Sequence, residues 1–273
     1  MMVKLAGTLV LVGAGKMGGA MLEGWLAGGA DPARIVAMDP SPPPEMRELI
    51  ARHDIRLNPD VAGIRDAEVV VIAVKPQLME EVLPGVAALK ASKPLVLSVA
   101  AGKTIASFER HFGSDAAVIR TIPNTPAAVG RGITAMASNA NVSPAQLALA
   151  RTLLEAVGEV VTVDNEAMID AVTAVSGSGP AYVFYLTECL AAAGEKVGLP
   201  RELAVQLARA TVAGAGELMR QSGTDAATLR QNVTSPKGTT YEALQVLMAA
   251  DGMAPLFDKA IAAATRRSRE LAS

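Results

Sequence analysis

Cysteine, histidine and aromatic residues are scarce in this chain. Cys189 is the only cysteine among 273 residues, so an intrachain disulfide is excluded, which fits a reducing, cytoplasmic compartment. Because Cys189 falls in the middle of an expected helix, we interpret it as a small buried apolar residue and not as a nucleophile. Aromatic residues make up 3% and hydrophobic residues 51% of the chain, so the core must consist mainly of Ala, Val, Leu, Ile and Met. This composition suits α/β layers and tightly packed helices.

A strong net charge, a membrane-spanning segment and a metal motif are also missing from the sequence. The formal net charge of −2 excludes a global basic field for nucleic acid. Gly13, Gly15 and Gly18 interrupt the apolar N-terminal run, which argues against a signal peptide. The uncharged stretch Ala171–Thr187 contains SGSGP, which would break a spanning helix. With one cysteine the chain has no CxxC metal site, so we expect a soluble protein with no membrane, nucleic-acid or metal partner.

Short apolar runs alternate with helical patterns over the first part of the chain. Thr8–Val12 and Ile35–Met38 are expected strands on either side of an expected helix at Lys16–Ala27. Ser143 and Pro144 form an N-cap and N1 pair that opens another helix. The remaining expected strands are Glu68–Val74, Leu95–Val99, Ala117–Ile122, Ile133–Ala137 and Glu159–Val163, and the remaining expected helices are Glu45–His53 and Gln77–Leu89. This order predicts a Rossmann-type, mostly parallel sheet domain over residues 1–165.

No strand pattern follows Asn165, so residues 166–273 are expected to form an all-helical domain. Glycine and proline separate its expected helices, which are Pro180–Val197, Pro200–Gln221, Ala226–Asn232, Thr240–Ala250 and Ala254–Leu271. Many positions in these helices are apolar on more than one face, and a small domain cannot bury so much apolar surface alone. We therefore expect these helices to pack against a second copy of the chain across a two-fold axis. Packing on the first domain alone is the alternative.

A glycine-rich motif follows the first expected strand and opens the first expected helix. It reads Gly13-Ala14-Gly15-Lys16-Met17-Gly18, the GxGxxG pattern of dinucleotide-binding folds. Gly13 permits the tight turn, Gly15 lets the backbone approach a pyrophosphate, and Gly18 lets the helix pack closely on the strand. The free N–H groups of the helix N-terminus then face the anion. A purely structural glycine turn is the alternative interpretation.

Asp39 lies 21 residues after Gly18, at the end of the second expected strand. An acidic residue at this place binds the ribose hydroxyls of NAD and repels a 2′-phosphate, so Asp39 favours NADH, although the sequence leaves NADPH or NADH open. Asp39 could instead cap the turn before Pro40. Ser41 is a further candidate for the ribose or a phosphate.

Other candidate cofactor residues follow the later strands, where ligands bind in open α/β sheets. They are Ala73, Val74, Lys75 and Pro76 after one strand, Ala100 and Ala101 after the next, and Asn124 after the strand that follows these two. Lys75 as an ordinary surface lysine is the alternative to a cofactor contact.

Two turns rich in glycine and hydroxyl groups lie in the expected helical domain. One is the segment 176–182, SGSGPAY, and the other is the segment 232–240, NVTSPKGTT. Each would present free N–H groups and hydroxyls at the positive end of a helix, which suits a small carboxylate. The chain has only two histidines, both near expected helix ends, so a histidine general acid is not expected. Ordinary capping turns are the alternative.

The chain resembles pyrroline-5-carboxylate reductases over nearly its whole length. The matching stretches are VGAGKMGGAM, AVKP, SVAAG, RTIPNTPA, AVSGSGPAY and NVTSPKGTTYEAL. The resemblance implies reduction of 1-pyrroline-5-carboxylate to L-proline with NADPH or NADH, by a dimer that can assemble further, up to a decamer. It also implies that the substrate lies between the nicotinamide and the helical domain of the partner subunit.

The resemblance assigns roles to residues of the second turn. Ser235 and the backbone of Gly238 and Thr239 would hold the substrate carboxylate, and Thr240 would bind the ring nitrogen as catalytic residue and proposed proton donor. Glu166 matches a position near the substrate, and Asn232 is placed with the cofactor residues. Lys237 departs from the glycine most common at its position, which puts the loop geometry in question.

The expected chemistry fits these residues, because a protonated cyclic imine needs orientation more than a strong acid. An isolated threonine hydroxyl is a poor acid, so Thr240 either relays a proton or only orients the iminium. A β-hydroxyacid dehydrogenase is disfavoured, because Val183 stands where its catalytic lysine would be. A related imine reductase or a non-catalytic dinucleotide sensor would also fit the expected fold, although Ser235, Thr239 and Thr240 argue against the sensor.

Overall fold

A computed structural model describes residues 3–272 and contains one eight-stranded sheet. The strand order is β3-β2-β1-β4-β5-β6-β7-β8. The strands are β1 (Thr8–Val12), β2 (Ile35–Met38), β3 (Arg56–Leu57), β4 (Ala67–Ile72), β5 (Leu95–Ser98), β6 (Ala117–Ile122), β7 (Gly132–Ser138) and β8 (Gly158–Thr162). All seven predicted strands are confirmed, with ends that shift by up to two residues. The two-residue β3 was not predicted, because so short a run has no period to detect.

Strands β1 to β6 run parallel, and β7 runs antiparallel to β6. A parallel return needs a long crossover, whereas β6 and β7 are joined by a short connection that contains the 3₁₀ turn Thr125–Val129. The order reverses at β1, which has β2 on one side and β4 on the other. The carboxyl end of β1 is therefore the switch point at which open α/β sheets bind ligands. The prediction of a Rossmann-type, mostly parallel sheet is confirmed.

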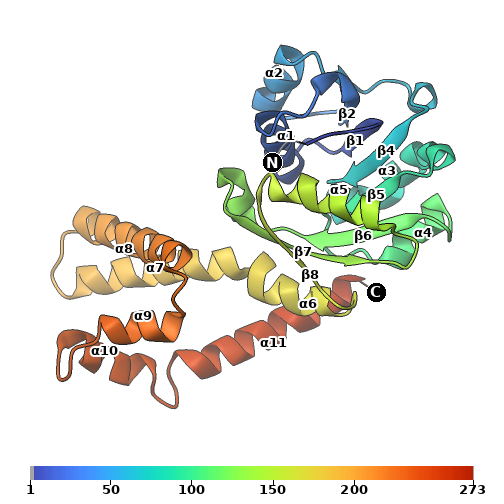
Figure 1. Cartoon of the computed structure of the whole chain (residues 1–273). Helices are drawn as coiled ribbons and strands as arrows, with labels where there is room; N and C mark the ends of the chain where they lie inside the picture. The colour runs from blue at the N-terminus through green and yellow to red at the C-terminus, as the bar shows by residue number, and fades with distance from the viewer. Residues whose placement is uncertain (1–2, 273) are drawn as a thin grey trace. The chain divides into compact units, whose positions relative to one another are not determined.

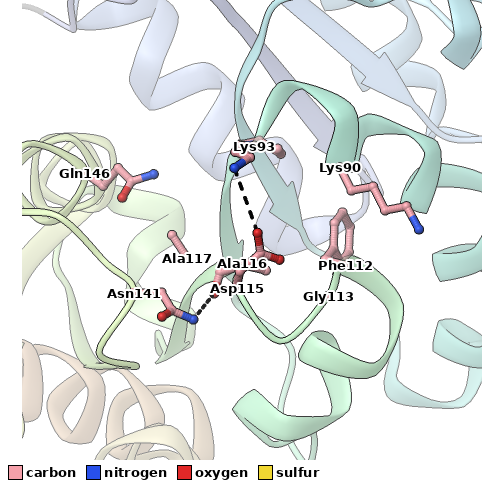
Figure 2. Close-up of a pocket in the computed structure, with 10 residues that line it drawn as sticks. Lys90, Lys93, Phe112, Gly113, Asp115, Ala116, Ala117, Asn141 and Gln146 are labelled. Carbon is pink, nitrogen blue, oxygen red and sulfur yellow. Dashed lines mark hydrogen bonds and ion pairs between the residues drawn. The ribbon is translucent and has the colours of Figure 1, made fainter.

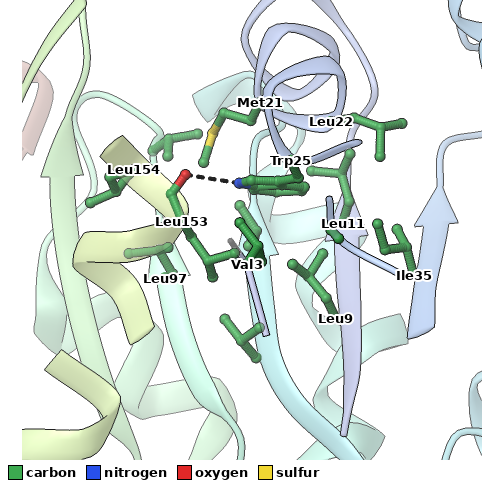
Figure 3. Packing of buried hydrophobic residues seen from close by; sticks show 14 of the residues in the cluster. Val3, Leu9, Leu11, Met21, Leu22, Trp25, Ile35, Leu97, Leu153 and Leu154 are labelled. Carbon is green, nitrogen blue, oxygen red and sulfur yellow. Dashed lines mark hydrogen bonds between the residues drawn. The ribbon is translucent and has the colours of Figure 1, made fainter. Parts of the chain in front are cut away.

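Helices α1 (Lys16–Ala27), α2 (Pro44–Arg52) and α5 (Pro144–Glu155) cover one face of the sheet (Figure 1). Leu9 and Leu11 of β1 point to this face, while Val10 and Val12 point to the other, so the strand is buried on both sides. Trp25 of α1 is fully buried there and donates its indole N–H to the carbonyl of Leu153 at 2.8 Å (Figure 3). This bond fastens α1 to α5.

Helices α3 (Met79–Val86) and α4 (Ile105–Phe112) cover the opposite face through Leu83, Phe108 and Phe112. The predicted helix at Gln77–Leu89 is divided into a 3₁₀ turn at Pro76–Leu78, then α3, then a 3₁₀ segment at Ala87–Ser92. Proline lacks the N–H group that would continue the helical hydrogen bonds, and Pro84 stands inside α3. The one continuous helix that we predicted is therefore wrong.

The predicted N-cap of α5 is confirmed. The Ser143 hydroxyl accepts from Gln146 N, and the Gln146 side chain accepts from Ser143 N at 3.0 Å, so both halves of a capping box are present. Such a cap contributes about 1 kcal/mol to helix stability.

The chain divides into two compact units, one formed by residues up to Gly177 together with those from Ala264 on, and the other by Ser178–Ala263. Both ends of the second unit are therefore joined to the first. From the sequence we predicted a domain boundary at residue 165. The segment between 165 and 177 contains α6 (Met168–Val172) and the π-helix Thr173–Gly177, which belong to the first unit.

The second unit consists of helices, and no strand follows Asn165 within residues 3–272. Its small residues Ala191, Ala204 and Ala208 are buried, and Gly194 lies against Ala204, which allows α7 and α8 to pack closely. The rings of Tyr182 and Phe257 meet edge to face, 6.3 Å apart. The helices are α7 (Gly179–Lys196), α8 (Arg201–Ser222), α9 (Ala226–Asn232), α10 (Thr239–Leu247) and α11 (Met253–Ala272), of which α11 runs on into the first unit.

Large apolar side chains of the second unit are exposed in the single chain. Examples are Phe184 at 62%, Leu218 at 54% and Leu256 at 60% exposure. Apolar surface of this kind marks an interaction surface. Cys189 is also exposed, so its predicted burial is wrong for the single chain. The physical reason is that α7 presents this part of its surface outward. At the same surface, a hydrogen bond with Cys189 raises the pKa of the Tyr185 hydroxyl.

Across residues 3–272, none of the helices combines the length and the apolar character that a bilayer crossing requires.

Candidate active site

The glycine turn after β1 combines two glycines that the fold requires with one that faces open space. Gly13 has φ +95°, and a Cβ on Gly18 would lie only 2.0 Å from the Gly13 carbonyl oxygen. A Cβ on Gly15 would have no protein atom within 4 Å. Gly15 is also the N-cap of α1 and carries no side-chain cap. The N–H groups of the first turn of α1 are thus available to an anion that approaches at Gly15.

Asp39 lies directly beside this turn. Its Oδ2 accepts from Ala14 N at 2.7 Å, and its Oδ1 accepts from Ser41 N at 2.8 Å. The side chain of Asn58 holds the Asp39 backbone through two bonds of 2.8 Å each. Asp39 therefore caps the turn before Pro40, as one of our two interpretations expected. A carboxylate oxygen accepts more than one hydrogen bond, so the same group can also accept from ribose hydroxyls.

The loops after β4, β5 and β6 lie at the same edge of the sheet, because these strands run parallel to β1. Ala73 of the first loop contacts Gly13 closely enough that a Cβ on Gly13 would lie 2.9 Å from its carbonyl. Val74 lies against the same glycine, whereas Lys75 is exposed and starts the 3₁₀ turn that contains Pro76. In the loop after β5, Ala100 is buried and Ala101 is exposed.

Asn124 follows β6 and is held by two neighbours. Its Oδ1 accepts from Ile133 N at 3.0 Å, and its Nδ2 donates to Ser176 Oγ at 3.3 Å. The second bond brings one hydroxyl of the SGSGP segment to the same edge as the glycine turn. The sequence did not predict this contact, because 52 residues separate the two partners.

The SGSGP segment is not the exposed turn that we predicted. Residues Thr173–Gly177 form a π-helix between α6 and α7, and Ser178 has helical dihedral angles. Pro180 has no N–H group to bond to the preceding turn, so the helical path widens here and does not open into a loop. The N–H groups of the SGSGP segment therefore do not form the open carboxylate site that we predicted. Single π-turns inside α-helices occur frequently at functional sites.

Glu166, a predicted substrate residue, forms an ion pair with a buried arginine that we did not predict from the sequence. Glu166 Oε1 accepts from Arg120 Nη1 at 2.8 Å and from Ile105 N at 2.8 Å. The Glu166 side chain is 29% exposed and that of Arg120 is 3% exposed. An arginine inside an apolar strand was the available signal, since a charge in a buried strand needs a partner.

Lys103 links the start of α4 to α3. Its Nζ donates to Glu80 Oε1 at 3.1 Å, and this hydrogen bond, with the lysine charge, lowers the pKa of the Glu80 carboxyl. His111 Nε2 lies 3.7 Å from Glu80 Oε2. One of the two histidines is thus placed beside an exposed carboxylate.

The second predicted turn lies before α10, in the second unit. Gly238 is the N-cap of α10 and has no side-chain cap, so the first N–H groups of the helix, including those of Thr239 and Thr240, are not bonded by a capping side chain. Ser235 closes the turn, because its carbonyl accepts from Gly238 N at 3.0 Å. Asn232 ends α9 on the other side of this turn. Residues with hydroxyl groups thus lie next to an uncapped helix start, and their binding of a carboxylate stays a prediction.

Lys237 has φ +58°, the left-handed conformation that glycine adopts without strain. For an L-residue this conformation costs about 1 kcal/mol or more. This conformation is compatible with the glycine that the family resemblance implies at this position. Lys237→Gly is expected to leave the free energy of unfolding unchanged or slightly higher, because the relieved strain is offset by the greater freedom of the unfolded chain, worth about 0.5–1 kcal/mol.

Lys237→Val provides the contrast, because a β-branched residue tolerates this conformation least. We expect it to lower the free energy of unfolding by roughly 1–3 kcal/mol. Urea unfolding of the three proteins at one protein concentration measures the order. Equal stability of the valine and glycine variants would contradict a strained turn.

A cavity of about 420 Å³ lies at the opposite edge of the sheet, where β5 and β6 begin (Figure 2). Lys93 Nζ and Asp115 Oδ2 lie 4.0 Å apart at its rim. None of the predicted site residues lines it. Its lining residues are Lys90, Lys93, Pro94, Phe112, Gly113, Asp115, Ala116, Ala117, Asn141 and Gln146. Among residues 3–272 no group of three or more His, Cys, Asp or Glu side chains is placed to hold a metal ion.

Two protein families match most of the chain. Residues 166–271 match the pyrroline-5-carboxylate reductase dimerisation family, and residues 8–102 match the family of coenzyme F420-dependent NADP oxidoreductases. The pyrroline-5-carboxylate reductase of Pseudomonas aeruginosa is 42% identical over 97% of this chain and 96% of its own length. That of Arabidopsis thaliana is 35% identical over 95% of this chain and 94% of its own.

Solved structures agree with these sequence matches. A pyrroline-5-carboxylate reductase from Coxiella burnetii has a TM-score of 0.91 at 35% identity and covers 98% of this chain and 100% of its own. The Plasmodium falciparum pyrroline carboxylate reductase, whose structure has NADP bound, has a TM-score of 0.81 at 28% identity and covers 100% of both chains.

Proposed function

Because this chain belongs to the pyrroline-5-carboxylate reductase family, we propose which of its residues carry out the reduction of 1-pyrroline-5-carboxylate to L-proline with NAD(P)H, the last step of proline biosynthesis. The observation that carries the assignment is a pair of helix starts. Helices α1 and α10 both begin at a glycine without a side-chain cap, and α10 also has hydroxyl groups in its first turn. Side chains cap α4, α5 and α9, whereas α2, α3, α6, α7 and α8 lack a side-chain cap but do not have glycine as the N-cap.

The residues at the carboxyl edge of the sheet fit a dinucleotide. The open space at Gly15 and the uncapped first turn of α1, with Lys16, Met17 and Gly18, suit a pyrophosphate. Asp39 is assigned to the ribose because it accepts from Ala14 N of the glycine turn, and Ser41 because its N–H donates to the same carboxylate. The loops with Ala73–Pro76, Ala100–Ala101 and Asn124 are assigned to the nicotinamide side. Asn232 is assigned to the cofactor by family resemblance. When bound, NAD(P)H supplies the hydride that reduces the imine carbon.

The turn before α10 is assigned to the substrate carboxylate. Ser235 and the N–H groups of Gly238 and Thr239 would donate hydrogen bonds to it, which are stronger than neutral ones because the acceptor is charged. Thr240, in the first turn of the same helix, is then beside the ring nitrogen and is assigned as the catalytic residue. Glu166 is assigned to the substrate side, where its charge would favour the protonated, more electrophilic form of the imine.

Thr240 orients the reacting ring, and its hydroxyl group can relay a proton to the ring nitrogen. The protonated imine is already electrophilic at carbon, so holding that carbon in place lowers the barrier more than a strong acid would. The threonine hydroxyl can accept from the N–H of the iminium and, after reduction, hydrogen-bond the new amine. A neutral imine would instead receive its proton through the Thr240 hydroxyl from solvent.

The protein self-associates, as the match to the dimerisation family indicates. The exposed apolar residues of α7, α8 and α11 support a dimer formed by the second unit, and further assembly to a decamer is part of the proposal. We also place the substrate turn of each subunit with the cofactor of its partner, as the family resemblance implies. A cytoplasmic location completes the proposal and is supported by the single cysteine, Cys189.

Cofactor oxidation by the purified protein tests the assignment. With 1-pyrroline-5-carboxylate as substrate, absorbance at the reduced nicotinamide band should fall with NADH or NADPH. The ratio of kcat/KM for the two cofactors tests Asp39, because a carboxylate at the ribose should favour NADH. A clear preference for NADPH would show that Asp39 acts only on the turn. Absence of oxidation with both cofactors by folded protein would remove the substrate assignment.

A further inference from the structure

Arg120 is a buried arginine with part of its hydrogen-bonding capacity unused. It lies in β6 and is 2% exposed. Its Nη1 donates to Glu166, but its Nε and Nη2 are buried and have no hydrogen-bond partner among the described residues. Buried donors without partners destabilise a protein, and a buried ion pair can often be replaced by apolar residues without loss of stability. Stability is therefore a poor explanation for an arginine at this position.

The position of Glu166 suggests a different reason. Its Oε1 accepts from Arg120 in β6 and from the backbone N–H of Ile105, the first residue of α4. The loop with Ala100 and Ala101 lies between β5 and α4, and β6 leads directly into Pro123 and Asn124. A single carboxylate oxygen, from the segment that precedes α6, thus joins the first residue of α4 to β6. These two elements adjoin the two loops assigned to the nicotinamide side.

We propose that Arg120 is a positioning residue for the reduction. It holds Glu166 in one arrangement, and through Glu166 it fixes the start of α4 and the loop of Ala100 and Ala101. Arg120 is too deeply buried to touch substrate or cofactor, so its whole effect passes through Glu166. The proposal rests on the assignment of the two loops and of Glu166 to the reaction given above.

A polar contact of the adjacent helix α6 provides a matched control. Asp170 Oδ1 accepts from Ser268 Oγ at 2.7 Å, and Ser268 is 6% exposed. This bond fastens α6 to α11 without involving Glu166. Ser268→Ala therefore removes a hydrogen bond of the helix that follows Glu166 and leaves the Arg120–Glu166 pair intact.

The test compares Arg120→Met, Arg120→Lys and the double variant Arg120→Met with Glu166→Gln against Ser268→Ala. Arg120→Met is expected to lower kcat at least tenfold while the dissociation constant of NADPH, measured by fluorescence, changes less than threefold. Arg120→Lys should recover several-fold in kcat, because an ammonium can still pair with Glu166. The double variant removes both charges, so its melting temperature should exceed that of Arg120→Met while its kcat stays low. Ser268→Ala should change kcat less than twofold.

Amide hydrogen exchange gives a readout that does not depend on turnover. The amides of residues 99–106 should exchange faster in Arg120→Met than in the parent protein. In Ser268→Ala their exchange rates should not change. Unchanged exchange there, or recovery of kcat together with thermal stability in the double variant, would overturn the positioning role. Failure of the reductase assignment would give a different result. The parent protein would then oxidise neither cofactor, while residues 99–106 would still exchange faster in Arg120→Met than in the parent.

Discussion

Gly15→Ala is expected to weaken NAD(P)H binding by a factor of about 10–100 while changing the free energy of unfolding by no more than about 1 kcal/mol. A Cβ on Gly15 meets no protein atom within 4 Å, and its φ of −72° is one that alanine adopts freely. The added methyl group therefore has no cost within the protein beyond a poorer N-cap. It occupies the space through which a pyrophosphate must approach the N–H groups of α1.

Gly18→Ala is the contrasting substitution in the same motif. Its Cβ would lie 2.0 Å from the Gly13 carbonyl oxygen, a backbone atom that cannot rotate away. We expect a loss of about 3 kcal/mol in the free energy of unfolding, at the upper end for overpacking. Urea unfolding and cofactor titration by fluorescence, performed on both variants, separate the two roles. If Gly15→Ala binds NAD(P)H as tightly as the parent, the pyrophosphate does not lie at the glycine turn.

Thr240→Ala is expected to lower kcat by a factor of about 100 and to leave NAD(P)H affinity unchanged. The hydroxyl lies in the first turn of α10, and the glycine turn that we assign to the pyrophosphate belongs to a different helix. Removing it deprives the ring nitrogen of its partner but not the cofactor of its site. Because Thr240 is a half-buried residue whose hydroxyl is proposed to face a ligand, the free energy of unfolding should change by about 0.5 kcal/mol at most.

Steady-state kinetics with Thr240→Ser as the control tests this role. Serine keeps the hydroxyl, so it should restore most of the turnover. Equal losses in turnover and in cofactor affinity would contradict an orienting role for Thr240.

Mixing Thr240→Ala with Gly15→Ala identifies the subunit that supplies the threonine. If the partner supplies it, each mixed dimer regains one intact site, and if a subunit uses its own threonine, no activity returns.

Much of the first unit could be predicted because its signals are local. Buried parallel strands are short apolar runs, and β1, β2 and β6 were predicted at their observed bounds. The GxGxxG motif marked the switch point because glycine positions reflect backbone geometry and not distant contacts. The second turn was also recognisable, since Gly238 at an uncapped helix start and the hydroxyls of Thr239 and Thr240 are neighbours in sequence.

The contacts that the sequence did not reveal join residues far apart in the chain. Glu166 bonds to Arg120 across 46 positions and Asn124 to Ser176 across 52, and no periodicity links such pairs. The SGSGP segment was mispredicted for a different reason. Glycine and proline are common in turns, but here they widen a helix into a π-turn, and the two outcomes share one composition.

The return of α11 to the first unit has a consequence for how the protein is made. Residues from Ala264 on belong to the first unit, where Ser268 bonds to Asp170, and they leave the ribosome after the whole second unit. Domains of a growing chain generally fold in the order of synthesis. The dinucleotide-binding unit departs from that order, because its final segment emerges only after the whole helical unit has been translated. A chain that stalls or is cut before Ala264 would therefore contain the complete glycine turn, but its first unit would lack the segment that α11 contributes.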